Sequence, residues 1–177
     1  MQIFTIGHST RSEEELLELL RQHGIGLLAD IRRYPGSKRY PHFASSAMAV
    51  WLPENGVTYI HVPELGGRRK PLPDSPNTAW RNEQFRAYAD YMATDAFRAA
   101  IDSLMAMSAE TRTAIMCAEA VPWRCHRNLA GDELLRRGIE VLHIIGSGSS
   151  RPHVLNEHAI VDGDHLTYPA EQRTLRL

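Results

Sequence analysis

The segment TRTAIMCAEAVPWRCHRNLAGDELLRRGIEVLHII, residues 111–145, decides the fold because it contains a complete strand–helix–strand unit. Apolar residues dominate 111–118 and 139–145, which is typical of strands buried on both faces. Residues 123–138 between them have the pattern of a helix, and Gly138 is a typical stop. A strand, a helix and a strand in this order predict parallel strands of one sheet.

The same alternation extends over the rest of the chain. Further strands are predicted at residues 2–6, 25–32 and 57–62. Further helices are predicted at residues 11–24 with Ser12 as N-cap, at 45–56, and at 80–107 with a restart at Thr94 or Asp95. After the fifth strand we expect a loop at 146–150, a short helix from Pro152 to His158, and a hairpin that turns at Asp162–Gly163.

These elements predict one three-layer α/β domain over residues 1–177. It has a mainly parallel, five-stranded, Rossmann-like sheet with helices on both faces, and a short hairpin near the end of the chain. Residues 1–146 form the core and residues 147–177 form a C-terminal extension.

Composition narrows the class of protein. The chain has 177 residues, of which 43% are apolar and 23% charged, as in a globular protein. A formal net charge of −1 gives no general attraction to nucleic acid or acidic membranes, so any anion site must be local. The N-terminus does not read as a signal peptide, and no apolar run has a transmembrane length of about 20 residues. We therefore expect a cytoplasmic protein with reduced cysteines and no membrane partner.

Polar side chains gather where the predicted strands end. The carboxyl ends of parallel strands meet at one edge of the sheet, and ligands bind there. Gly7, His8, Ser9 and Thr10 follow the first strand; Asp30, Arg32 and Ser37 end or follow the second; Cys117, Glu119, Arg124, Cys125, His126 and Arg127 end or follow the fourth. The loops at the opposite edge contain fewer polar side chains of this kind, so the sequence predicts a cationic site at the edge where the strands end.

Several short motifs resemble the DUF488 family, a domain of unknown function in small prokaryotic proteins. They are TIGHS (5–9), DIRRYPGS (30–37), ELGG (64–67), CAE (117–119), CHR (125–127) and GIEVLHI (138–144). The resemblance runs from about residue 3 to about residue 146. It implies a site at the same edge and leaves the chemistry open, because the family has no settled activity.

Both cysteines lie in this site, and their chemistry has alternatives. Cys117, Cys125 and His126 could ligate zinc, but the chain has no Cys-x-x-Cys pair, and adjacent residues near a helix start point in different directions. We therefore expect no metal and no other cofactor, and we place Cys117 in the core. Six residues separate Cys117 from Arg124, too many for a phosphatase-like loop, which leaves Cys125 as the candidate nucleophile.

Two functional hypotheses follow from these residues. In the first, the protein is a hydrolase or transferase acting on a phosphate-containing or other anionic substrate, such as a nucleotide or nucleic-acid end. Arg32, Arg124 and Arg127 hold the anion, Glu119 is the general base, and His126 or His8 is the acid. That role of Glu119 requires burial under the loop 63–78. In the second, the same pocket binds a nucleotide or nucleic acid without chemistry.

Other expected partners follow from the same loops. Basic runs lie near Tyr34, Tyr40 and Trp80, so the sequence allows contact with nucleic acid as well as with a small anionic ligand. It also allows a homodimer. Among the remaining histidines, His143 is predicted in the core and His153 at the surface or in a loop.

Overall fold

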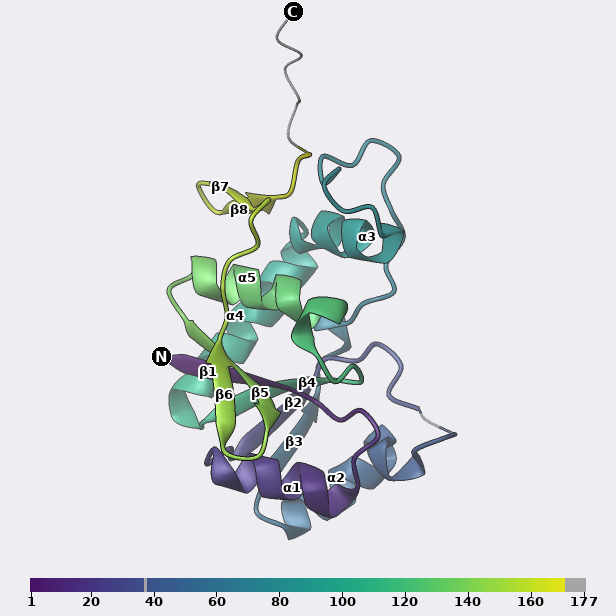
Figure 1. Ribbon diagram of the computed structural model, residues 1–177, viewed down its shortest axis with the longest axis vertical. Coiled ribbons are helices and arrows are strands. Elements are labelled where there is room, and N and C mark those ends of the chain that lie inside the picture. The colour runs from purple at the N-terminus through teal and green to yellow at the C-terminus, as the bar shows by residue number, and fades with distance from the viewer. Residues whose placement is uncertain (37, 171–177) are drawn as a thin grey trace, which may run out of the picture.

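A six-stranded sheet runs through the centre of the computed structural model, which describes residues 1–36 and 38–170 (Figure 1). The strand order is β3-β2-β4-β1-β5-β6. The strands are β1 (Gln2–Gly7), β2 (Leu27–Asp30), β3 (Thr58–His61), β4 (Thr113–Cys117), β5 (Glu140–Gly146) and β6 (Ser149–Pro152). Strands β1 to β5 are parallel and β6 pairs antiparallel with β5. This confirms the predicted α/β class with five parallel strands.

Helices cover both faces of the sheet, also as predicted (Figure 1). Helices α1 (Glu13–Gln22) and α2 (Ser45–Glu54) pack on one face. Helices α3 (Glu83–Met92), α4 (Asp95–Glu110) and α5 (Arg127–Arg136) pack on the other. Alternate side chains of each strand pack into the cores on the two faces of the sheet, because successive side chains of a strand point to opposite faces. Among the described residues, no helix is long and apolar enough to cross a membrane.

Local signals fix the ends of several helices. Ser12 caps α1 in a capping box with Glu15, and Thr94 caps α4, so the predicted long helix at 80–107 is divided into α3 and α4. Gly24 and Gly138 follow helix ends with φ of +64° and +78°, a conformation that glycine adopts without strain.

The chain after β5 differs from the prediction in two places. The expected loop at 146–150 contains the start of β6, whose four residues are all exposed and therefore show no apolar periodicity. The expected helix from Pro152 to His158 does not form. The His153 amide instead donates to Val141 O at 2.8 Å, and the chain continues to the hairpin of β7 (Ile160–Asp162) and β8 (His165–Thr167). The hairpin itself is confirmed.

A buried chain of polar side chains anchors this C-terminal segment. Thr5 Oγ1 lies 2.7 Å from His143 Nδ1, His143 Nε2 lies 3.0 Å from His153 Nδ1, and His153 Nε2 lies 2.8 Å from Asp132 Oδ1. Tyr168 donates to the other oxygen of Asp132 at 2.9 Å. The network joins β1, β5 and α5 to the end of the described chain. His153 lies in a loop, one of the two predicted places, but it is buried and not at the surface.

The network explains why His143 stays neutral. An ionised Asp132 can only accept, so His153 donates Nε2–H to Asp132, His143 donates Nε2–H to His153, and Thr5 donates its hydroxyl to His143. Burial, followed by the nearby His153 and Arg127, lowers the pKa of His143 to about 3 from its ordinary 6.5.

We expect His143→Gln to flatten the dependence of stability on pH. Between pH 6.5 and 3 the unfolded chain binds a proton at His143 that the folded protein excludes, so the free energy of unfolding falls as the pH is lowered. The contribution is about 1.4 kcal/mol per pH unit, or roughly 3 kcal/mol between pH 6.5 and 4.5. Urea unfolding at several pH values measures it. Exposed His158→Gln is the control, and parallel curves for His143→Gln and the wild type would contradict the assignment.

Candidate functional site

Strand β4 ends where the connections of the sheet diverge. It lies between β1 and β2. Both neighbours lead into helices on one face, α1 and α2, whereas β4 leads into α5 on the other face. Such a switch opens a crevice at the carboxyl ends of the strands, where α/β proteins bind ligands. Cys117, the last residue of β4, lies at this point.

Backbone hydrogen bonds hold the loop after β1 against the loop after β4. The His8 amide donates to Cys117 O at 3.0 Å and the Ser9 amide donates to Ala118 O at 2.9 Å. A side chain at Gly7 would not fit, because a Cβ there would lie 1.8 Å from Glu119 O. Glycine at this position therefore permits the close approach of the two loops.

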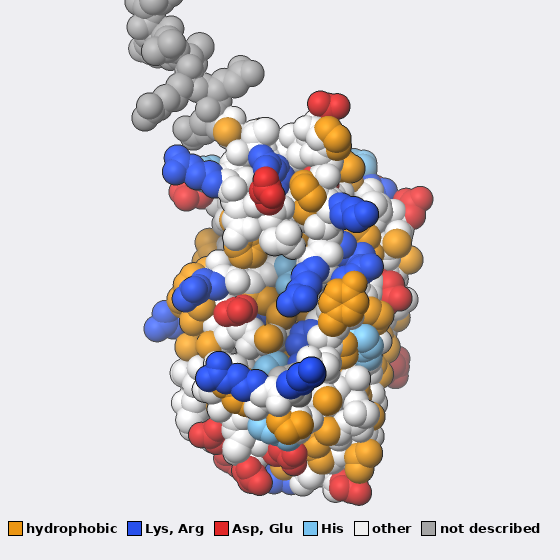
Figure 2. All heavy atoms as spheres, turned by 90° about the vertical axis from the view of Figure 1, so that its right-hand side faces the viewer, with side chains coloured by type: hydrophobic (Ala, Val, Ile, Leu, Met, Phe, Trp, Pro, Cys, Tyr) orange, Lys and Arg blue, Asp and Glu red, His pale blue; other side chains and the backbone are white. Residues whose placement is uncertain are grey.

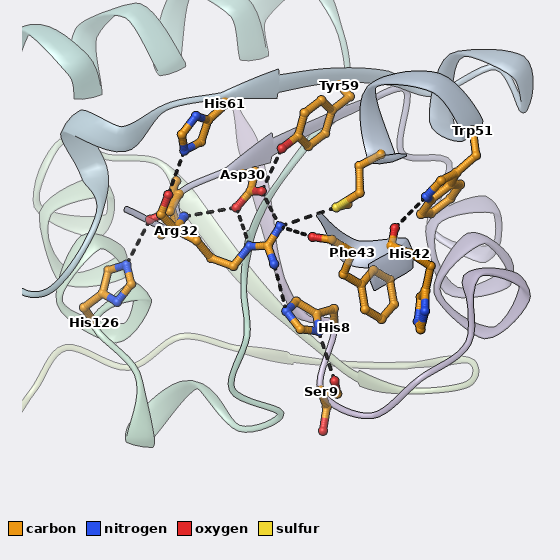
Figure 3. A network of polar contacts seen from close by, with 12 residues as sticks. His8, Ser9, Asp30, Arg32, His42, Phe43, Trp51, Tyr59, His61 and His126 are labelled. Atoms are coloured by element: carbon orange, nitrogen blue, oxygen red, sulfur yellow. Dashed lines mark hydrogen bonds and ion pairs between the residues drawn. The ribbon is translucent and has the colours of Figure 1, made fainter. Parts of the chain in front are cut away.

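The loop after β2 is held by a buried ion pair between Asp30 and Arg32 (Figure 3). Arg32 Nη2 donates to Asp30 Oδ2 at 2.6 Å and Nε donates to Oδ1 at 2.8 Å. The same guanidinium donates to Phe43 O at 2.8 Å, and Tyr59 donates to Asp30 at 2.8 Å. Asp30 thus balances the charge of Arg32 inside the protein, and Arg32 connects the loop after β2 to the segment that contains Phe43.

His8 belongs to the same network and is neutral. Arginine can only donate, so Arg32 Nη1 donates to His8 Nε2 at 3.1 Å and His8 Nδ1–H donates to Ser9 O at 3.0 Å. Burial, and then the Arg32 charge, lowers the pKa of His8 to about 4. Both ring nitrogens are engaged, so the described contacts make His8 a connector between the loops after β1 and β2.

Cys117, Cys125 and His126 converge on one point. The two Sγ atoms and His126 Nδ1 all lie within 4.8 Å of one another. His126 Nδ1 is 3.9 Å from Cys117 Sγ and 3.8 Å from Cys125 Sγ. On the opposite side of the ring, His126 Nε2 is 3.2 Å from Ile31 O (Figure 3). A carbonyl only accepts, so Nε2 carries the proton and Nδ1 presents its lone pair to the two sulfurs.

This convergence corrects the expectation that Cys125 and His126 point apart. The predicted helix at 123–138 is interrupted: η3 (Pro122–Arg124) ends at Cys125, and α5 begins at Arg127. Cys125 is extended (φ −139°, ψ 145°), whereas His126 is helical (φ −58°, ψ −20°). The change of backbone conformation between the two residues turns both side chains toward Cys117. Cys117 is buried, yet it borders the pocket described below.

The surroundings of the two thiols differ. A hydrogen bond with Cys125, assisted by His126 and Arg127, holds the pKa of Cys117 well below its ordinary value. The same hydrogen bond and burial raise the pKa of Cys125. Arg127 is buried; its Nη2 donates to Ala120 O at 2.9 Å, while Nε and Nη1 have no hydrogen-bond partner among the described residues. No described carboxylate forms an ion pair with Arg127.

A pocket of about 530 Å³ opens onto these three side chains. Its wall comes from the loops after β2, β3 and β4 and from the start of α3. The lining residues include Arg32, Arg33, Tyr34, Gly67, Arg68, Gln84, Phe85, Glu119, Trp123 and Arg124. Figure 2 looks onto this edge of the molecule and shows Lys and Arg side chains gathered across its middle.

The predicted site residues divide into two groups. Those that line the pocket are Arg32, Glu119, Arg124, Cys125 and His126. Those that lie behind it or beside it are Gly7, His8, Ser9, Thr10, Asp30 and Arg127. Ser37 lies outside the described residues.

Comparison with known proteins identifies the family. A family model described as "Domain of unknown function DUF488" matches residues 12–134. The chain belongs to the DUF488 family. The match includes β2, β4 and the whole of the loop from Cys117 to Arg127. No curated protein and no solved structure matches the chain.

The paired glycines of this DUF488 protein bring the loop after β3 into the site. A Cβ at Gly66 would lie 2.8 Å from the Arg33 backbone, and a Cβ at Gly67 would lie 2.9 Å from His126 Nδ1. Arg69 fixes the loop by donating to the carbonyls of Pro63, Glu64 and Gly66. Sequence reasoning missed these close approaches, together with Phe85 and Gln84 of α3. The glycine pair was the one available signal.

Glu119 has a different environment from the one that a buried general base requires. It is exposed at the mouth of the pocket, and its carboxylate forms no hydrogen bond or ion pair with a described residue. The loop at 63–78 does not bury it.

We expect Gly7→Ala to destabilise the protein by about 1–3 kcal/mol, the usual cost of overpacking. The new methyl group would meet Glu119 O at 1.8 Å and Arg127 Nη1 at 2.7 Å, and the first of these is backbone that cannot rotate away. Gly36→Ala is the matched control because a Cβ there meets nothing within 4 Å. Urea unfolding measures both variants, and equal stability of Gly7→Ala and the wild type would contradict the close packing of the two loops.

Proposed function

We propose that this DUF488 protein is an enzyme, a hydrolase or transferase, that acts on a substrate with a phosphate or another anionic group, such as a nucleotide or nucleic-acid end. The observation that carries the proposal is the composition of one pocket. Its rim has arginines without carboxylate partners, and its floor has two cysteines and a histidine in mutual contact range.

The charge of the pocket favours an anion. Four arginines and one carboxylate, Glu119, line it. Arg32 is paired with Asp30, but Arg33, Arg68 and Arg124 form no ion pair with any described carboxylate. Three cations around one exposed carboxylate leave a local positive charge in a chain whose formal net charge is −1. Arginine suits this task because its planar fork binds phosphate and carboxylate through paired hydrogen bonds.

The aromatic residues of the pocket favour a nucleotide among anionic ligands. Tyr34, Phe85 and Trp123 line it, and the side chains of Tyr34 and Trp123 are 65% and 59% exposed. Exposed aromatic rings beside arginines are the usual means by which proteins stack nucleic-acid bases without reading sequence. A ligand with a base and a phosphate would use both kinds of side chain.

The proposal gives each predicted residue a role that its contacts permit. Arg124 and the neighbouring rim arginines hold the anion, and Glu119 is the general base at the mouth. The reacting atom lies over Cys117, Cys125 and His126. Arg32 in the pocket wall is a positioning residue, and the other positioning residues lie behind or beside the pocket: Gly7, His8, Asp30 and Arg127.

A second candidate is a binding module that uses the same pocket without chemistry. The exposure of Glu119 favours it, because a carboxylate surrounded by water lacks the burial that tunes most catalytic bases. The two candidates predict the same ligands and differ only in turnover.

We expect Arg124→Ala to weaken the binding of nucleoside phosphates and inorganic phosphate by about 10-fold, equivalent to one lost charge-assisted contact of about 1.4 kcal/mol. The weakening should shrink at high salt, since exposed charges are screened. Thermal shift and calorimetry with a nucleotide panel measure it. Arg151→Ala, an exposed arginine on β6 outside the pocket lining, is the matched control. Absence of binding to the wild type, or equal binding by Arg124→Ala, would contradict the proposal.

The same panel separates the enzyme from the binding module through Glu119→Gln. The nucleotide that binds the wild type most tightly is incubated with both proteins, and its products are separated by chromatography. The enzyme predicts that turnover falls by about 100-fold or more, the scale of general-base catalysis, while binding survives. Binding by the wild type without any product would favour the module instead.

A further inference from the structure

We propose that Cys117, Cys125 and His126 hold one divalent transition-metal ion of the zinc class and leave a fourth coordination position open toward the pocket. The inference deepens the proposed function, on which its use in catalysis rests. Metal binding itself can be tested without any substrate.

The spacing of the three donor atoms suits zinc. Zinc binds thiolate sulfur at about 2.3 Å and imidazole nitrogen at about 2.0–2.1 Å, so sulfur and nitrogen in a tetrahedral site lie about 3.5 Å apart. Here Nδ1 of His126 lies 3.9 Å and 3.8 Å from the two sulfurs. The two sulfurs lie within 4.8 Å of each other, against about 3.8 Å in a tetrahedral zinc site, so side-chain rotations that move the sulfurs by up to about 1 Å would complete the geometry.

The orientation of His126 is that of a metal ligand. Metal-binding histidines usually donate their other ring N–H to a carbonyl or a carboxylate, which fixes the tautomer and the ring. His126 Nε2 lies 3.2 Å from Ile31 O, and the Tyr88 ring packs 5.0 Å from the imidazole. Tyr88 is itself fixed, because its hydroxyl donates to Leu65 O at 2.9 Å. The lone pair of Nδ1 is therefore held toward the sulfurs before any ion arrives.

The number of ligands points to an open site. Structural zinc sites are closed by four protein ligands, whereas catalytic sites have three and keep one position for water or substrate. Within the described chain, no fourth His, Cys, Asp or Glu joins the cluster. Gly67 keeps space beside the ligand atom, because a Cβ there would lie 2.9 Å from Nδ1. All three ligands line the pocket, so the open position faces the proposed substrate.

The charge around the cluster is consistent with a bound ion. Two thiolates would neutralise one divalent cation, so the loaded cluster would leave no net charge in this buried place. A bound ion would act as a Lewis acid on an oxygen of the substrate or on a water in the fourth position. The bound ion would supply an electrophilic centre, which none of the described side chains around Cys117 provides.

The test uses the purified full-length protein and begins with its metal content. We expect about one zinc per chain by elemental analysis. After removal by a chelator, Co²⁺ should bind with the thiolate charge-transfer absorption and the visible bands of a tetrahedral site. Cys117→Ser, Cys125→Ser and His126→Ala should each weaken Co²⁺ binding by about 10-fold or more, whereas exposed His158→Ala should bind as the wild type does. Circular dichroism reports whether each variant is folded.

Measurements on the wild type keep the inference testable if the cysteine variants do not fold. Zn²⁺ should protect both thiols from a thiol-specific reagent, and the visible Co²⁺ bands should change when azide or inorganic phosphate enters the open position. Two freely reactive thiols with no Co²⁺ charge-transfer absorption would overturn the metal site and leave thiol chemistry at Cys117 or Cys125. Bands that do not respond to azide or phosphate would overturn the open position.

The outcomes also separate this inference from the proposed function. Anion binding that depends on Arg124 in a protein that binds no metal would overturn the metal site alone. Metal binding without any anion binding or turnover would overturn the proposed enzyme and retain the metal site.

Discussion

Strand β4 pairs with β1 on one side and with β2 on the other, and it sends the chain to the opposite face from both neighbours. This placement opens a crevice at the end of β4, and every other feature of the site lies around it. Cys117 stands at the crevice because it is the last residue of the strand. The loop that follows folds back over Gly7 and brings Cys125 and His126 to the same point.

Much of the remaining polar structure keeps this crevice in shape. Asp30 and Arg32 bind the loop after β2 to Phe43 and His8, and His8 joins the loop after β1. Asp132 of α5 forms a hydrogen bond with His153, and His153 forms one with His143 of β5, so these side chains hold the helix against the sheet. Burial removes the hydrogen bonds of these polar groups to water, and the groups form hydrogen bonds with one another in their place. The loops around the pocket therefore have little freedom to move apart. The pocket is preorganised, which is what a binding or catalytic site requires.

The sequence was sufficient to predict the layers, the five parallel strands and the edge at which polar side chains gather, because apolar periodicity and helix caps act locally. It did not predict β6, since its residues are exposed and it is held by backbone pairing with β5. It correctly placed Cys117 in the core, but it directed Cys125 away from His126. Their convergence depends on backbone angles at residues 125 and 126, which no spacing rule encodes. The sequence predicts Arg32 and Arg127 as anion ligands, and it did not predict that both are buried, with Arg32 paired to Asp30 and one Arg127 nitrogen bound to Ala120 O.

The fold presents an unprotonated Nδ1 of His126 to two cysteines at the floor of the pocket. A long-range proton–nitrogen correlation spectrum of ¹⁵N-labelled protein tests it directly, with His126→Gln to assign the signals. We expect a protonated Nε2, which donates to Ile31 O, and an unprotonated Nδ1 whose resonance shifts when one equivalent of Zn²⁺ is added. A proton on Nδ1, or a spectrum that Zn²⁺ leaves unchanged, would contradict it.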